Sequence, residues 1–321
     1  MSRAAKIWLV TAVSLILAGC MILVGAMMRL DWNFMKLSTE QFETEEYEIN
    51  EAFSSISVDC DTAGVEFVPS EDGKSRVICY EREKAKHTVQ VRDGVLFVEL
   101  TDTRKWYEYI GIHWGTPKIN LYVPAGAYGA LEIENDTGAI KLPAAFSFES
   151  IRISEDTGAV RCEASATKEI DIENDTGAIH LSNVTAGSLK LEVSTGAIDL
   201  SKVTCEGDAQ IEVSTGRTTL TDLKCNRFFS EGSTGDIRFN NVIVKERLTV
   251  ERSTGDVQLN ASDAGELSIT TDTGSVTGTL LSEKVFLTET DTGRVRVPQS
   301  TAGGRCEITT DTGDIKIEIT K

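Results

Sequence analysis

The sequence predicts an all-β protein, a right-handed β-solenoid with about 19–20 residues per coil, preceded by one transmembrane helix. The first observation is a motif, Asp-Thr-Gly or Ser-Thr-Gly, that recurs at intervals of 19 or 20 residues. Such a period is typical of solenoids, whose coils bury their apolar sides by stacking, and parallel crossovers favour the right-handed form. The ten glycines of the motif, expected at structural turns, are Gly138, Gly158, Gly177, Gly196, Gly216, Gly235, Gly255, Gly274, Gly293 and Gly313.

Composition is the second observation. The 321 residues include 26 Gly and only 5 Pro, together with abundant Thr, Ser, Val and Ile, which favours strands joined by tight turns. Lys and Arg number 32 against 50 Asp and Glu, a formal net charge of −18. Nucleic acid is therefore not expected as a partner, because phosphate binding depends on clustered basic residues.

The third observation is the uncharged stretch 7–28, which we expect to form the transmembrane helix. As a helix its 22 residues span about 33 Å, close to the hydrocarbon thickness of a bilayer. Arg3 and Lys6 favour a cytoplasmic N-terminus for residues 1–6 and a single-pass protein whose C-terminal domain is extracellular. Two alternatives remain open: a lipobox-like Leu-Ala-Gly-Cys that would lipidate Cys20, and a cleaved signal peptide.

Three further regions follow the membrane span. Residues 29–50 are expected to form a polar spacer, 51–130 irregular first coils with a cap, and 131–321 the regular repeats. Asp61-Thr62-Ala63-Gly64 is interpreted as a degenerate copy of the motif. Terminal coils of solenoids are commonly distorted in this way.

An aromatic insertion interrupts the first coils between residues 104 and 114. It contains Trp106, Tyr107, Tyr109 and Trp114. One interpretation is a lid that covers the apolar end of the core. The other is an exposed binding surface for a glycan or a surface protein, because rings on loops supply contact area at low entropy cost.

Within the repeats, apolar residues predominate seven and five residues before the glycine and two and four residues after it. This alternation predicts a strand, a corner at the glycine, and a second strand in every coil. Val184, Val203, Leu223 and Val242 add a third inward column. The Asp or Ser two residues before the glycine is expected to hold the corner by hydrogen bonding to the local backbone.

A row of glutamates is predicted four residues before consecutive glycines. Its members are Glu192, Glu212, Glu231 and Glu251, which would stack in neighbouring coils. The row is interpreted either as a solvated face that discourages aggregation or as a possible Ca²⁺ ladder. No other cofactor and no metal cluster are predicted, because the 3 His are scattered, and bridges between Cys205 and Cys225 or Cys60 and Cys79 stay open.

Catalysis is not predicted, and no catalytic residue is assigned. Asp-Thr-Gly is also the signature of aspartic proteases, but copies in register along one edge imply no facing pair of carboxylates. A carbohydrate-active β-helix enzyme is a further alternative, although no insertion between the regular coils suggests a cleft.

The chain resembles the bacterial putative-adhesin family of β-strand-repeat proteins, a domain of unknown function. The resemblance rests on the membrane anchor followed by Phe53-Ser54-Ser55-Ile56, the Asp-Thr-Gly and Ser-Thr-Gly series, and the ending Ile308-Thr309-Thr310-Asp311-Thr312-Gly313-Asp314-Ile315. It implies a non-enzymatic solenoid at the cell surface, an adhesin or interaction protein. The alternative is an accessory or scaffold of the cell-envelope stress response.

Overall fold

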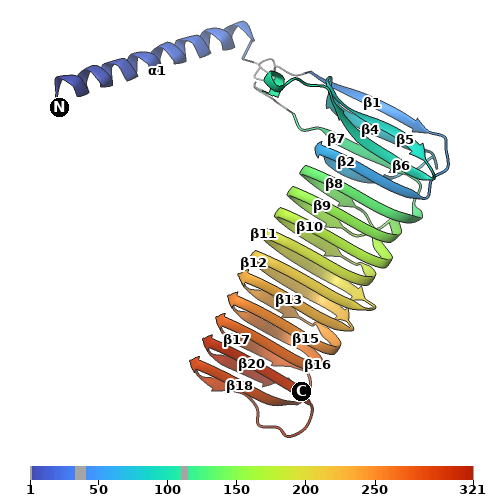
Figure 1. Ribbon diagram of the computed structural model, residues 1–321, viewed down its shortest axis with the longest axis vertical. Coiled ribbons are helices and arrows are strands. Elements are labelled where there is room, and N and C mark those ends of the chain that lie inside the picture. The colour runs from blue at the N-terminus through green and yellow to red at the C-terminus, as the bar shows by residue number, and fades with distance from the viewer. Residues whose placement is uncertain (1, 33–40, 110–114, 321) are drawn as a thin grey trace.

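The computed structural model describes residues 2–32, 41–109 and 115–320 and shows a long stack of β-coils preceded by a single helix (Figure 1). Helix α1 (Arg3–Arg29) includes the whole predicted span 7–28. Its first turn is capped by Ser2, whose hydroxyl oxygen accepts a hydrogen bond from the backbone N–H of Ala5 at 3.2 Å. The helix is long and apolar enough to cross a membrane, a property that a signal sequence shares.

The central part of the stack consists of parallel strands. Strands β8 to β12 continue through the motif corner, whereas β13, β15 and β16 end there and a new strand follows. The Thr and Gly of the motif pair with their equivalents in the next coil, as in Gly177 with Gly196 and Thr176 with Thr195. These strands are β8 (Gly126–Leu142), β9 (Phe146–Cys162), β10 (Ser165–Ser182), β11 (Thr185–Cys205), β12 (Asp208–Cys225), β13 (Arg227–Thr234), β14 (Ile237–Asn240), β15 (Ile243–Thr254), β16 (Val257–Thr273) and β17 (Val276–Leu280). The β-solenoid predicted from the repeat is therefore confirmed.

The core is one continuous column of apolar side chains inside the coils. The predicted inward positions before and after the corner are buried, for example Leu191 and Ile198 on β11. The third column is buried as well, at Val184, Val203, Leu223 and Val242. Each coil therefore buries residues from three sides, and no coil can form a core without its neighbours.

At the N-terminal end, a first coil stacks directly on β8. It consists of β2 (Ser55–Thr62) and β3 (Gly64–Pro69), and Thr62 pairs with Thr137 of the first full motif. Asp61-Thr62-Ala63-Gly64 thus occupies the corner position, as its resemblance to the motif indicated. Beyond this coil lie β6 (Val95–Asp102), parallel to β2, and β7 (Lys118–Val123), parallel to β3.

Antiparallel strands complete an N-terminal cap on these two strands. β5 (Ala85–Arg92) pairs with β6, β4 (Ser75–Arg82) pairs with β7, and β1 (Phe42–Ile49) pairs with β4. Strand β1 lies within the segment 29–50 that the sequence analysis assigned to a spacer. Alternating side chains of β1, such as Tyr47 and Ile49, pack against the core, so the folded domain includes residues 42–49.

At the C-terminal end, the order of coils in space departs from their order in the sequence. β20 (Gly304–Thr312) pairs with β16 on one side and with β18 (Lys284–Thr292) on the other. Likewise β21 (Ile315–Ile319) lies between β17 and β19 (Val295–Arg296). The last coil of the sequence is therefore inserted beneath residues 284–296, which form the end of the stack.

The side chains explain this order. The inserted coil buries Cys306, Ile308, Ile315 and Ile317 almost completely. The end coil instead has Thr288 at an inward position, and Val295 is 42% exposed. Placing the more apolar coil between two neighbours buries more apolar surface than the reverse order would.

The motif glycine is required by close approach between coils. A Cβ atom added at Gly196 would overlap the carbonyl oxygen of Gly177, and the same conflict recurs at the other corners. Gly196 also has φ of +154°, in the region that favours glycine. The first coil has Ala63 at this position, and no motif glycine precedes it in the sequence.

A row of buried polar side chains lies inside the corner, three residues before the glycine. Asn135 Nδ2 donates to Glu155 Oε2 at 2.6 Å, and the Gly138 N–H donates to Glu155 Oε1 at 3.1 Å. In later coils Asn174 and Thr310 donate to glycine carbonyls of neighbouring corners. In these coils the inward residue supplies the side-chain hydrogen bond at the corner, whereas Val193 and Val213 hold that position in β11 and β12. The Asp two residues before the glycine is exposed, as at position 136.

Glu155 is only 2% exposed, and its charge is therefore costly. Burial raises the pKa of this carboxyl to about 7, and the hydrogen bonds from Asn135 and Gly138 oppose the rise only in part. The folded protein keeps a proton on Glu155 at mildly acidic pH that the unfolded chain has already lost.

We expect Gly196→Ala to lower the free energy of unfolding by about 3 kcal/mol or more, because two coils must separate to admit the methyl group. The reverse change at the first coil, Ala63→Gly, should cost only about 1 kcal/mol through backbone entropy. Thermal melting followed by circular dichroism of the full chain in detergent measures both. Equal losses for the two variants would refute the close-approach explanation.

We expect Glu155 to make the protein less stable as the pH rises from about 4.5 to 7, since the folded state binds the extra proton in that window. Its contribution is on the order of 2–3 kcal/mol. Glu155→Gln should remove this part of the pH dependence, whereas the exposed neighbour Glu132→Gln should not. Melting temperatures at pH 5 and pH 8 test it, and an unchanged pH dependence in Glu155→Gln would contradict it.

Candidate functional site

The aromatic segment lies between β6 and β7 and includes the 3₁₀ helix η2 (Trp106–Tyr109). Trp106 is 77% exposed, and Tyr107 and Tyr109 are about half exposed at 50% and 53%. Trp114 lies outside the described residues. The three described rings are exposed to solvent. The strands of the N-terminal cap, and not these rings, cover the apolar end of the stack.

Ion pairs hold the base of this segment in place. Lys84, at the turn between β4 and β5, pairs with Glu108, whose other oxygen accepts the Lys105 N–H at 2.9 Å. The Arg104 guanidinium binds Asp102 and lowers the pKa of that carboxyl to about 2. The backbone beneath the rings is thus held by two ion pairs, Lys84 with Glu108 and Arg104 with Asp102.

The rings are arranged around these cations. The Tyr109 hydroxyl donates to Asp102 Oδ2 at 2.9 Å, and the Arg104 guanidinium lies 4.3 Å from the centre of the Tyr109 ring. Trp106 and Tyr107 contact each other edge to face at 5.9 Å between ring centres. The result is an exposed aromatic pair next to fixed polar groups, a combination suited to binding a sugar ring or a protein side chain.

The segment lies near the point where the folded domain begins. The backbone N–H of Glu83, beside Lys84, donates to the carbonyl of Gln41 at 3.1 Å. Only 11 residues lie between Arg29, the last residue of α1, and Gln41. Fully extended, they reach about 40 Å.

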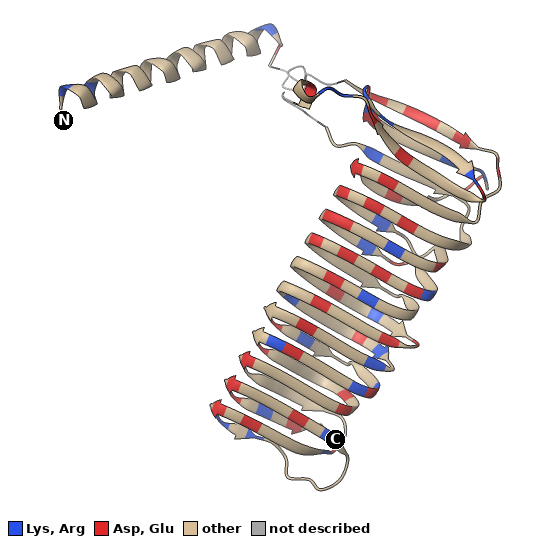
Figure 2. Cartoon of the chain, in the orientation of Figure 1, with Lys and Arg blue, Asp and Glu red and all other residues tan. Residues whose placement is uncertain are grey.

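The predicted glutamate row is confirmed as a row by strand register. Glu192 pairs with Glu212, Glu212 with Glu231, and Glu231 with Glu251. The coil before it extends the row, because Glu173 pairs with Glu192. Acidic residues recur along the strands of the whole stack, as Figure 2 shows.

Basic side chains partly neutralise the negative charge of the glutamate row near both of its ends. Lys190 Nζ lies 3.0 Å from Glu173 and 4.0 Å from Glu192. Arg252 is only 5% exposed and donates to Ser230 Oγ at 2.8 Å, in space that Gly232 leaves free by lacking a side chain. Burial lowers the pKa of this guanidinium to about 10, yet it remains charged at neutral pH.

A shallow pocket of about 430 Å³ opens over this end of the row. Its lining includes Glu231, Glu251 and Asp272, but also the Arg252 side chain. The positive charge beneath the carboxylates reduces their attraction for a divalent cation. The middle of the row, at Glu212, is the part farthest from both cations.

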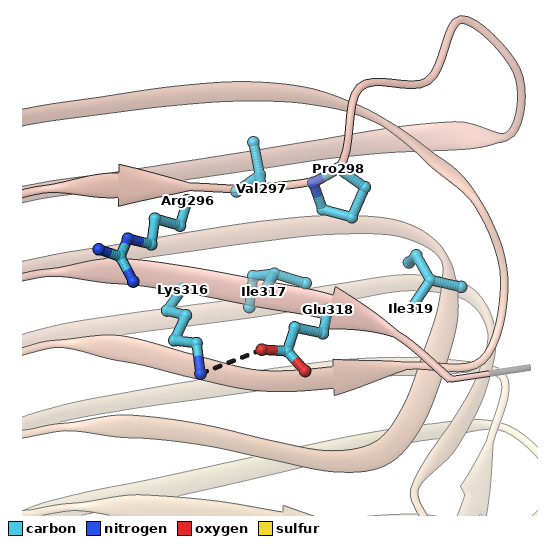
Figure 3. Close-up of a pocket in the computed structure, with 7 residues that line it drawn as sticks. All are labelled: Arg296, Val297, Pro298, Lys316, Ile317, Glu318 and Ile319. Carbon is cyan, nitrogen blue, oxygen red and sulfur yellow. Dashed lines mark ion pairs between the residues drawn. The ribbon is translucent and has the colours of Figure 1, made fainter.

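A second pocket, of about 550 Å³, lies at the opposite end of the stack from the aromatic segment (Figure 3). The register of β19 with β21 ends at Arg296 and Lys316, and Pro298, which has no backbone N–H, follows in the chain. Figure 3 shows the segment with Val297 and Pro298 running beside the strand that carries Ile317, and the ion pair between Lys316 and Glu318 (3.0 Å) lies on that strand. This pocket is open to solvent and exposes little apolar surface.

The structure also brings together a group that the sequence analysis did not connect. Cys79, Glu81 and His87 are all buried in the N-terminal cap, and their ligand atoms lie within 4.8 Å of one another. The sequence analysis did not predict this group, because the three histidines are far apart in the sequence. The pattern Cys-x-Glu on one strand with a histidine on the next was the available signal.

The seven cysteines are free thiols, including the pairs that the sequence analysis left open as bridges. Six of them are buried, and only Cys20 on α1 is exposed. Burial raises the pKa of the Cys79, Cys162, Cys225 and Cys306 thiols to about 12, so these thiols are not nucleophiles at neutral pH.

Three solved structures are similar to this chain, and the first of them supports the fold. A crystal structure of a putative adhesin from Parabacteroides merdae is similar with a TM-score of 0.51 and 14% identity, over 88% of this chain and 98% of that one. A putative adhesin from Bacteroides fragilis has a TM-score of 0.41 and 18% identity, over 88% and 99%. A putative lipid binding protein from Parabacteroides distasonis has a TM-score of 0.49 and 15% identity, over 75% and 98%.

The comparison with curated proteins finds no match. A family model does match, and it covers residues 53–318, from the first coil to the last strand. The match includes the regular coils, the inserted C-terminal coil and the N-terminal cap apart from β1. The chain therefore belongs to the Toastrack DUF4097 family.

Proposed function

We propose that the protein is a non-enzymatic interaction protein of the cell surface, anchored by α1, whose aromatic segment binds a glycan or a surface protein. The observation that carries the proposal is the exposure of Trp106 and Tyr107 on a backbone braced by ion pairs. Large exposed rings on a rigid support lose little entropy on binding and dominate the affinity of many interfaces. The resemblance of the fold to proteins named as putative adhesins is consistent with this role.

The position of the segment restricts the partner. With α1 in the membrane, the short connection to Gln41 keeps the aromatic segment within about 40 Å of the bilayer. A partner at this height belongs to the layer immediately outside the membrane. We therefore propose a cell-envelope glycan or an envelope protein as the first class to test.

The row of glutamates is proposed to act mainly as a solvated face. Parallel in-register stacking places like charges side by side at about 4.8 Å, which disfavours lateral association with a second acidic stack. Lys190 and Arg252 limit the repulsion within the row itself. Repeating the binding assay below with and without Ca²⁺ also tests whether the row takes part in recognition.

We expect the double variant Trp106→Ala/Tyr107→Ala to bind its partner about 30-fold more weakly, the loss that corresponds to about 2 kcal/mol at an aromatic hot spot. The full-length chain in detergent is applied to arrays of bacterial envelope glycans and extracellular-matrix proteins. Trp32→Ala, which removes another exposed tryptophan, is the matched control and should bind like the parent chain. A hit that both variants retain, or no saturable hit, would reject the aromatic segment as the site.

We expect α1 to be retained as a single membrane span with the coils outside the cell. Intact-mass spectrometry of the mature protein should then show the full chain without a lipid, and Cys20→Ala should leave the membrane fraction unchanged. External protease on intact cells should remove the solenoid and leave α1 in the membrane. A mature chain that begins at Cys20 and carries lipid, or one that has lost α1, would overturn this topology.

A further inference from the structure

We propose that Cys79, Glu81 and His87 form a binding site for one Zn²⁺-like transition-metal ion inside the N-terminal cap. The site is separate from the aromatic segment and from the glutamate row. It lies between the paired strands β4 and β7 and the paired strands β5 and β6, and it would join the two halves of the cap.

Strand alternation places the three side chains on the inside. On β4 the inward residues are Val77, Cys79 and Glu81, all 0% exposed, and on β5 they are Ala85 and His87 at 4% each. Elsewhere such inward positions in this chain are mostly apolar. Glutamate and histidine are rarely buried this deeply without a compensating partner, because desolvation of their polar atoms is costly.

The contacts within the cluster supply hydrogen-bond partners for only some of the buried polar atoms. Glu81 Oε2 lies 2.7 Å from His87 Nδ1 and also accepts the backbone N–H of His87 at 2.7 Å. Among the described residues, the other carboxylate oxygen, Glu81 Oε1, has no hydrogen-bond partner although it is fully buried. A metal ion would supply the missing interaction to that carboxylate.

The distances and the donor types suit a single ion. The thiol, carboxylate and imidazole atoms lie within 4.8 Å of one another, and Zn²⁺ bonds of about 2.0–2.3 Å bridge atoms about 4 Å apart after small side-chain adjustments. Sulfur and nitrogen donors favour Zn²⁺ or a similar transition metal, whereas Ca²⁺ and Mg²⁺ prefer oxygen donors throughout.

A small cavity lies beside His87. Its volume is about 10 Å³, and its lining includes His87, Arg82 and Asp61 but neither Cys79 nor Glu81. A space of this size holds at most one water molecule, and water is the usual fourth ligand of zinc when a protein supplies three. Tyr47 of β1 supports the site from the other strand pair, because its hydroxyl donates to the carbonyl of His87 at 2.9 Å.

The test uses the full-length chain in detergent, treated with a chelator, dialysed and then titrated with Zn²⁺. We expect one equivalent of zinc per chain that survives gel filtration, a higher melting temperature, and an X-ray absorption spectrum with one sulfur at about 2.3 Å among nitrogen and oxygen ligands. Because this measurement is made on the unaltered protein, it does not depend on the folding of a variant.

Variants then assign the ligands. Cys79→Ser and His87→Gln should weaken zinc binding by more than about tenfold, and Cys79→Ser should also remove the sulfur from the absorption spectrum. The controls are Cys162→Ser, which changes another buried thiol, and His180→Gln, which changes an exposed histidine. Both should bind zinc like the parent chain.

Zinc bound by oxygen and nitrogen alone in the unaltered protein would place the ion elsewhere, for instance on the exposed glutamate row. Less than one equivalent, or binding unchanged by both cluster variants, would likewise overturn the proposal. A cluster that fails these tests is a buried hydrogen-bonded pair with a neighbouring thiol.

Discussion

Backbone contact between successive corners is the constraint on which the rest of the stack depends. The carbonyl oxygen of each corner glycine lies where the next corner would carry a Cβ atom. Only glycine lets the corners approach to the spacing of parallel strands, and that spacing brings every other position of the coil into register. The exception is consistent with the same reasoning, because Ala63 stands at the corner of the first coil, which no motif glycine precedes in the sequence.

Because neighbouring coils are in register, residues at the same coil position lie in a row along the stack. The residue type decides whether such a row stabilises or destabilises the stack. Apolar rows stabilise the core in proportion to the surface they bury. Rows of carboxylates repel, and the chain moderates this with Lys190, which pairs with carboxylates on two neighbouring coils, and with Arg252 folded over Gly232. Other exposed ion pairs join neighbouring coils, such as Arg227 with Asp208 at 2.6 Å, although each contributes little in water.

The candidate sites for binding lie where the repeat is interrupted. The N-terminal cap replaces stacked corners with antiparallel strands, and this change creates both the turn that holds Glu108 and the interior that encloses Cys79, Glu81 and His87. At the opposite end, the loop after Pro298 allows the last coil of the chain to return beneath residues 284–296. That end carries charged residues at its edge, among them Glu289, Asp291 and Arg294, which oppose edge-to-edge association.

The sequence alone determined the solenoid, its period, the corners and the inward columns, because these follow from local periodicity repeated ten times. It also determined the apolar helix, because residues 7–28 carry no charge. It also located the glutamate row, since equal spacing from the glycine implies register. Only the tertiary structure decided the exposure of Trp106, the polar row at Asn135 and Glu155, the order of the last two coils, and the meeting of His87 with Cys79 and Glu81. Each of these features depends on contacts between segments that are distant in the sequence, and no local pattern specifies which segments pair. The reason is that a side chain becomes buried only if covering it lowers the free energy more than covering other surfaces of the folded chain.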